Sequence, residues 1–143
     1  MTEDTPLKGS CLCKKVTVEL SKTPKTFSVC HCDMCRTWSG GVGMDFDAGR
    51  HVTFSGEDFV GRYDSSEWAE RGFCKSCGTH LFYRLKKTDH YYLYLGLFGD
   101  AVSPVFDTQE FIDEKPAYYS FANETKTRTK AESDVLLEKY LST

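Results

Sequence analysis

The sequence predicts one mostly β domain over residues 1–143, made of antiparallel sheets with a short helix near the C-terminus. Its 143 residues suit a single domain with a hydrophobic core of its own. Short runs of β-branched and aromatic residues recur along the chain, and clusters of Gly, Asp and Ser interrupt them. Aromatic residues make up 14% of the chain, a share that suits packed sheets.

The predicted strands follow one another at short spacing, with apolar residues in every second position of the first. In chain order, the runs that predict strands are Lys15–Leu20, Thr26–Val29, Val42–Phe46, His51–Ser55, Phe59–Tyr63, Trp68–Cys74, Thr79–Arg84 and Tyr91–Phe98.

The segment Ser133–Leu141 predicts the helix. Its apolar residues recur at four-residue spacing, as in Leu136 with Tyr140. Ser133 is the predicted N-cap, because its hydroxyl can accept a hydrogen bond from a free amide of the first turn.

Composition excludes several classes of function. The net charge of -3 argues against a general surface for nucleic acid or for anionic membranes. No apolar stretch approaches the roughly 20 residues that span a bilayer, and the N-terminus lacks the apolar segment of a signal peptide. We therefore expect a cytoplasmic protein, in which clustered cysteines bind metal more often than they form disulfides.

Four of the seven cysteines form two short pairs. Cys74 and Cys77 are spaced as Cys-x-x-Cys before Gly78, a turn that can direct both thiolates at one metal ion. Cys11 and Cys13 are spaced as Cys-x-Cys, and side chains two residues apart on an extended segment face the same way. Together the pairs predict a closed four-cysteine zinc site that stabilises the fold.

The remaining cysteines, Cys30, Cys32 and Cys35, fall within six consecutive positions. They can supply three corners of a tetrahedron and leave the fourth to water or substrate, which is typical of catalytic zinc. Other interpretations stay open: His31 or His80 as a further ligand, Cys32 and Cys35 as a redox dithiol, or thiols without a special role.

Three motifs, GSCLCKKV, CHCDMCRTWSGG and FCKSCGTHLFY, together resemble the glutathione-dependent formaldehyde-activating enzyme (Gfa/CENP-V) family. The resemblance covers Gly9–Tyr83, and a looser likeness over Phe111–Glu124 extends the motif core to about residues 9–124. It implies a β-tent fold of antiparallel sheets held by zinc. It also implies two zinc ions per chain, one structural and one catalytic, on the cysteine sets Cys11, Cys13, Cys74 and Cys77, and Cys30, Cys32 and Cys35.

The resemblance further implies a carbon–sulfur lyase that forms or cleaves S-(hydroxymethyl)glutathione, with glutathione, or another small thiol, and formaldehyde as partners. The alternative is a zinc-stabilised binding module of the same fold without catalysis. Neither interpretation includes a nucleic-acid or membrane partner. Arg36 is expected either to meet a carboxylate of glutathione or to cover a sheet edge, and Trp38 either to wall the site or to join the core.

Overall fold

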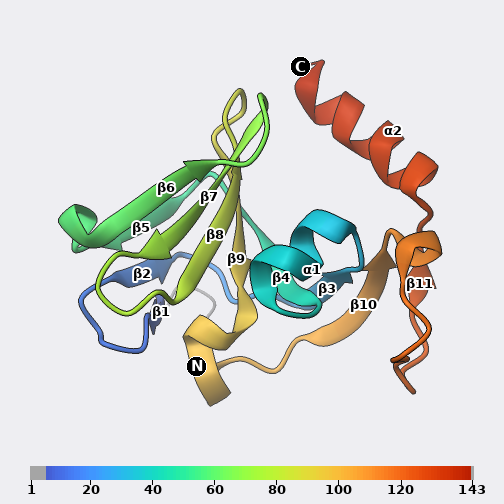
Figure 1. The fold of residues 1–143 in the computed structure, drawn as a ribbon. Coiled ribbons are helices and arrows are strands. Elements are labelled where there is room, and N and C mark those ends of the chain that lie inside the picture. The colour runs from blue at the N-terminus through green and yellow to red at the C-terminus, as the bar shows by residue number, and fades with distance from the viewer. Residues whose placement is uncertain (1–5, 143) are drawn as a thin grey trace.

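The computed structural model describes residues 6–142, which form two sheets and two helices (Figure 1). The small sheet is antiparallel, in the order β1-β2-β5. Its strands are β1 (Leu7–Ser10), β2 (Thr17–Leu20) and β5 (Val52–Ser55). β1, close to the N-terminus, was not predicted.

The large sheet has eight strands in the order β11-β10-β3-β4-β9-β8-β7-β6. All pairs are antiparallel except those of β10, which runs parallel to both of its neighbours. The strands are β3 (Thr26–Cys30), β4 (Gly43–Gly49), β6 (Val60–Asp64), β7 (Ala69–Cys74), β8 (His80–Leu85), β9 (His90–Tyr94), β10 (Val105–Glu110) and β11 (Lys126–Thr127).

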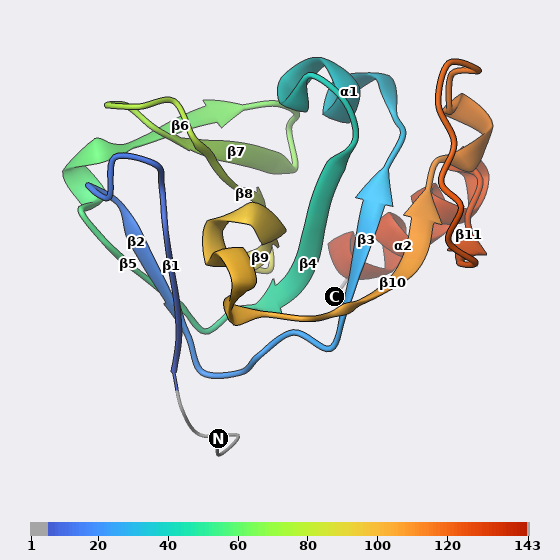
Figure 2. The ribbon, with the colours of Figure 1, turned by 90° about the horizontal axis from the view of Figure 1, so that it is seen from below.

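The hydrophobic core lies between the small sheet and one face of the large sheet. Figure 2 shows the small sheet on one side, β3 and β4 on the other, and the 3₁₀ segment η2 (Leu95–Ala101) between them. The most completely buried side chains of this core are Val16, Val18, Phe82, Leu81 and Leu93. The apolar alternation of β2 thus faces inward, as the sequence predicts.

The opposite face of the large sheet is polar and aromatic. Strand register places Asp45 beside Tyr94, Tyr92 beside Tyr83, and Tyr83 beside Arg71. Because paired residues project to the same side of a sheet, their side chains gather on one face. This polar face is the one that receives the candidate site.

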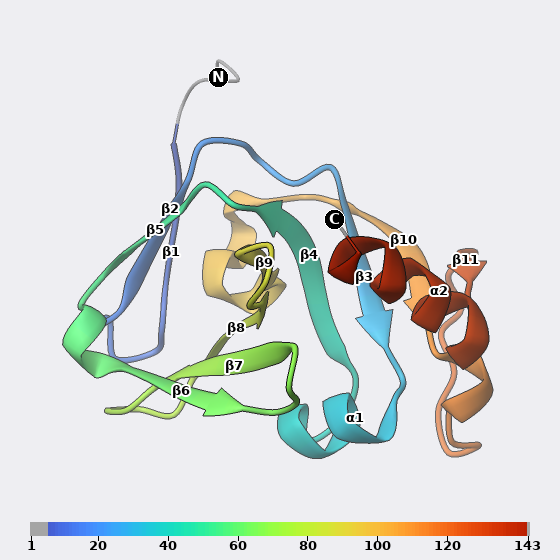
Figure 3. The same ribbon diagram turned by 90° about the horizontal axis from the view of Figure 1, so that it is seen from above.

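Two helices flank the large sheet. α1 (Asp33–Ser39) connects β3 to β4, begins after the N-cap Cys32 and ends at Gly40, whose φ of 71° is left-handed. α2 (Lys130–Leu141) lies across the sheet from β10 toward β9 (Figure 3). No helix within residues 6–142 is long and apolar enough to cross a membrane.

The prediction of a mostly β fold with a C-terminal helix is confirmed, although some boundaries differ. The N-cap of α2 is Thr129, which forms a capping box with Glu132. Ser133 lies inside the helix, and its hydroxyl donates to Glu110 at 2.7 Å. The strand predicted over Tyr91–Phe98 ends at Tyr94, where η2 begins.

Two other short 3₁₀ segments, η1 (Glu57–Phe59) and η3 (Ile112–Glu114), connect strands at the surface. η1 leads into the edge strand β6, and η3 follows β10 directly. The chain from η3 to β11 contains Tyr118 and Tyr119, which border a cavity described below.

Candidate functional site

The four-cysteine cluster consists of Cys11, Cys13, Cys74 and Cys77, whose sulfur atoms all lie within 4.8 Å of one another. The Sγ atoms of Cys11 and Cys13 are 3.6 Å apart, and those of Cys13 and Cys74 are 3.7 Å apart. A tetrahedral zinc ion with four sulfur ligands at about 2.3 Å has an edge of about 3.8 Å. The sulfur atoms therefore fit one metal ion, and they join the small sheet to the large one.

Backbone amides in the turns around this cluster donate hydrogen bonds to its sulfur atoms. The amide of Val16 donates to Cys11 Sγ at 3.3 Å, and the amide of Cys77 donates to Cys74 Sγ at 3.4 Å. Gly78 adopts a φ of 80°, so its amide can return to the carbonyl oxygen of Cys74 at 2.8 Å. Such N–H to sulfur bonds stabilise the ionised ligand and fix its direction.

The three-cysteine cluster consists of Cys30, Cys32 and Cys35, and its sulfur atoms also lie within 4.8 Å of one another. Cys30 is the last residue of β3, and Cys35 lies in the first turn of α1. The amide of Cys35 donates to Cys32 Sγ at 3.3 Å. The strand end and the helix start therefore bring together thiols that a plain extended segment would keep apart.

Electrostatics within the three-cysteine cluster favour a bound cation. Hydrogen bonds from the thiols of Cys30 and Cys35 lower the pKa of Cys32 to about 2. Hydrogen bonding with Cys32 and Cys35, together with burial, raises the pKa of Cys30. Partly buried thiols this close resist ionising together unless a positive charge compensates them. A divalent metal ion supplies that charge, so the donor set suits a soft metal such as zinc.

No fourth ligand joins this cluster from the Cys, His, Asp and Glu side chains of residues 6–142. His31 is fully buried, and both of its ring nitrogens have partners elsewhere. Its Nε2 donates to Gln109 Oε1 at 2.8 Å, and Tyr119 donates its hydroxyl to Nδ1 at 2.6 Å. His80 stacks on Trp38, with ring centroids 4.6 Å apart. Neither histidine closes the cluster.

Arg71 is the neighbour that the sequence analysis missed. It is 2% exposed, and its Nη2 donates to Cys35 Sγ at 3.5 Å. Its guanidinium lies 5.8 Å from the ring centre of Trp38 and 5.0 Å from that of Tyr83. The signal available in the sequence was a charged residue in the middle of the strand predicted over Trp68–Cys74. In the structure this strand is β7, and it is almost entirely buried.

Other polar groups surround Arg71 on the same face. Burial raises the pKa of Asp45 to about 7, although the Arg71 guanidinium opposes that rise. Burial also raises the pKa of Tyr94 to about 12. Trp38 is half-buried between His80 and Arg71, so it borders this polar group and lies outside the hydrophobic core.

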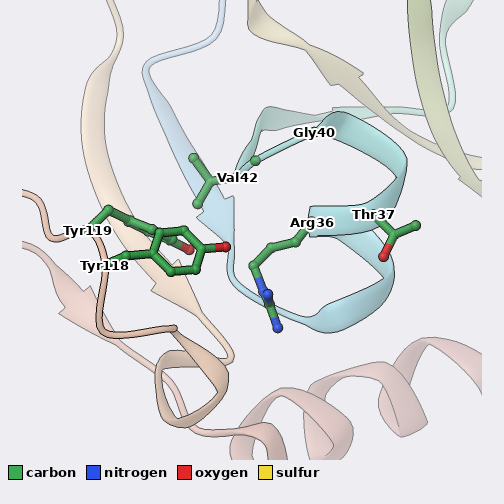
Figure 4. A pocket seen from close by; sticks show the side chains of 7 residues that line it. Arg36, Thr37, Gly40, Val42, Tyr118 and Tyr119 are labelled. Atoms are coloured by element: carbon green, nitrogen blue, oxygen red, sulfur yellow. The ribbon is translucent and has the colours of Figure 1, made fainter.

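A cavity of about 450 Å³ lies between α1 and the segment that holds Tyr118 and Tyr119 (Figure 4). We call it the Arg36 pocket; its lining residues are Arg36, Thr37, Gly40, Gly41, Val42, Tyr118 and Tyr119. Arg36 Nε donates to the backbone oxygen of His31 at 2.9 Å, so this side chain is attached to the cysteine segment.

Comparisons with known proteins identify the family of this chain and agree with its fold. A family model described as glutathione-dependent formaldehyde-activating enzyme matches residues 6–114. An uncharacterized lyase of Schizosaccharomyces pombe is 38% identical over 122 residues, covering 85% of this chain and 89% of that protein. The crystal structure of a Rhodobacter sphaeroides protein matches with a TM-score of 0.55 at 21% identity, covering 68% of this chain and 92% of that one, and shares the fold. The chain therefore belongs to the glutathione-dependent formaldehyde-activating enzyme family.

Proposed function

We propose that the protein is a cytoplasmic, zinc-dependent carbon–sulfur lyase that forms or cleaves S-(hydroxymethyl)glutathione from glutathione and formaldehyde. The four-cysteine cluster holds a structural zinc ion, and Cys30, Cys32 and Cys35 hold a catalytic one. Family membership supports the activity, as does the name of the related lyase. The observation that carries the proposal is a three-thiol cluster with no fourth side-chain ligand among residues 6–142.

The two clusters differ in a way that suits these roles. Four protein ligands leave a zinc ion no position for substrate, whereas three leave one corner for an exchangeable group. When bound at the three-cysteine cluster, zinc supplies positive charge that stabilises a thiolate or polarises a carbonyl oxygen. The reaction joins the glutathione sulfur to the formaldehyde carbon, and the thiol proton is transferred to the former carbonyl oxygen.

The chain contributes the charges and surfaces around that reaction. Arg71 holds a permanent positive charge beside Cys35, which offsets the negative charge of the thiolates. Asp45 has a carboxyl pKa of about 7, so its side chain can accept or release a proton near neutral pH. Trp38, stacked on His80, lies against the guanidinium of Arg71.

The proposal is tested by measuring how fast the adduct forms and dissociates, because glutathione and formaldehyde also combine without an enzyme. Exchange NMR with isotope-labelled formaldehyde gives that rate at equilibrium. We expect the zinc-loaded protein to accelerate exchange and Cys35→Ser to abolish the acceleration. The matched control is Ser21→Ala, an exposed residue in the loop between β2 and β3. Wild-type protein with full zinc and no acceleration would favour a non-catalytic binding module.

A further inference from the structure

The Arg36 pocket lies along α1, whose N-cap, Cys32, belongs to the three-cysteine cluster. Cys32, Arg36 and the C-cap Gly40 follow one another at four-residue spacing. The amide of Arg36 donates to the carbonyl oxygen of Cys32 at 3.0 Å, which places Arg36 one helical turn after Cys32. Arg36 and Gly40 both line the pocket, so the pocket extends along the side of α1 that starts at Cys32.

Arg36 is the only charged side chain among the lining residues of this pocket. Its Nε is used by the backbone oxygen of His31, and its Nη2 is 4.0 Å from the carboxylate of Asp33. That carboxylate is 87% exposed, so water screens its attraction. Figure 4 shows Arg36 extending from α1 on the side that faces Tyr118 and Tyr119. The guanidinium therefore keeps N–H groups for a negatively charged ligand.

The remaining walls favour a flexible polar ligand. Gly40 and Gly41 have no side chains that would narrow the pocket, and a Cβ at either position would meet nothing within 4 Å. Tyr118 and Tyr119 present aromatic surface, with Tyr118 the more exposed. The hydrogen bond from Tyr119 to His31 attaches this wall to the segment between Cys30 and Cys32. This hydrogen bond therefore holds the pocket wall at a fixed position relative to the three-cysteine cluster.

We propose that the Arg36 pocket binds a carboxylate of the thiol substrate on the Arg36 guanidinium while the thiol reaches the three-cysteine cluster. The assignment rests on the proposed function, and it makes Arg36 a specificity-determining residue for thiols that carry a carboxylate. A volume of about 450 Å³ lies within the usual range for small-molecule sites. Bidentate hydrogen bonding between guanidinium and carboxylate supplies the recognition.

Binding without turnover provides the first test. The probe is S-methylglutathione, whose blocked sulfur cannot react, and its affinity is measured by calorimetry. We expect Arg36→Gln to weaken binding about tenfold, since one charge-assisted pair is lost. Arg50→Gln, an exposed arginine outside the pocket, is the matched control and should bind like the wild type. Equal affinity of Arg36→Gln and the wild type would overturn the assignment.

Changing the ligand tests the same contact on the wild-type protein, so the result does not depend on how well Arg36→Gln folds. Two analogues of S-methylglutathione are used, each with one carboxylate converted to an amide. We expect one of them to bind the wild type about tenfold more weakly than the parent ligand. For Arg36→Gln, that amide and the parent ligand should bind equally. If neither amide weakens binding to the wild type, Arg36 does not recognise a carboxylate.

Kinetics then separate this inference from the proposed function. We expect Arg36→Gln to raise KM for glutathione about tenfold relative to KM for mercaptoethanol, a thiol without a carboxylate. If the wild type is active and Arg36→Gln has the same ratio of KM values for the two thiols, the inference is wrong and the lyase proposal is unaffected. If the wild type is inactive but its binding of S-methylglutathione depends on Arg36, the lyase proposal is wrong and the carboxylate pocket is supported.

Discussion

The side chain of Arg71 donates a hydrogen bond to Cys35, with Nη2 3.5 Å from Sγ. Three thiolates around a divalent ion carry one net negative charge, and the buried guanidinium cancels it. Hydrogen bonds to metal ligands of this kind commonly affect metal affinity as strongly as they affect ligand orientation. Arg71 is therefore expected to support the three-cysteine cluster directly.

We expect Arg71→Met to weaken zinc binding at that cluster about 10- to 100-fold, because the thiolates lose a buried cationic donor. Competition with a chelator measures the affinity, and Arg71→Lys should retain part of it. Arg62→Met is the control, since Arg62 lies on the neighbouring strand β6 and pairs with Glu70. Equal zinc affinity in all three variants would assign Arg71 a packing role.

Cys74→Ser should impair folding more than Cys32→Ser. Metal binding at a closed four-ligand site adds directly to the free energy of unfolding, and this cluster joins the two sheets. Thermal melts of zinc-loaded proteins should place Cys74→Ser at least about 10 °C below Cys32→Ser. The reverse order would contradict the division into structural and catalytic sites.

Removing one thiol from the three-cysteine cluster should lower the metal content without unfolding the protein. For Cys32→Ser and Cys35→Ser we expect zinc to fall from about two ions per chain to about one. Elemental analysis gives the count, and the far-ultraviolet circular dichroism spectrum checks the fold. If both variants keep the wild-type zinc content, these cysteines do not form a metal site.

Asp45 should make stability depend on pH. Its pKa rises from 3.8 to about 7, first through burial and then through Glu110, Asp47 and Cys32, against the effect of Arg71. The folded protein thus holds a proton that the unfolded chain releases, so this contribution to stability falls as pH rises from about 4 to about 7. Urea midpoints of Asp45→Asn should decline less over that window than those of the wild type. Parallel curves would show that Asp45 ionises normally.

The cysteine clusters were predictable because their information is local. The spacing within Cys74-x-x-Cys77 and within Cys30-x-Cys32 already limits where the sulfur atoms can lie. The spacing of the clusters along the chain does not reveal that Cys13 and Cys74 meet, but the demand for four ligands does. In the structure the sulfur atoms of each set lie within 4.8 Å of one another, close enough that each set could hold a metal ion.

The surroundings of the site were less predictable because they depend on strand order. Arg71 reaches Cys35 only because β7, β8, β9 and β4 lie side by side and place α1 beside that face. α1 also lacks the usual start signal, since its N-cap is Cys32 in place of Ser, Thr, Asp or Asn. β10 was missed because its two buried residues, Thr108 and Gln109, are polar, so the segment has no apolar alternation.

The contact between Cys13 and Cys74 also bears on how the chain matures during synthesis. These residues are 61 positions apart, which a ribosome adds in about 3 to 12 s. Cys11 and Cys13 therefore leave the ribosome that long before their partners, and the small sheet is incomplete until β5 (Val52–Ser55) follows. The four-cysteine cluster should therefore be most sensitive to oxidants and to zinc shortage before Cys77 emerges, and less sensitive once its four ligands have met.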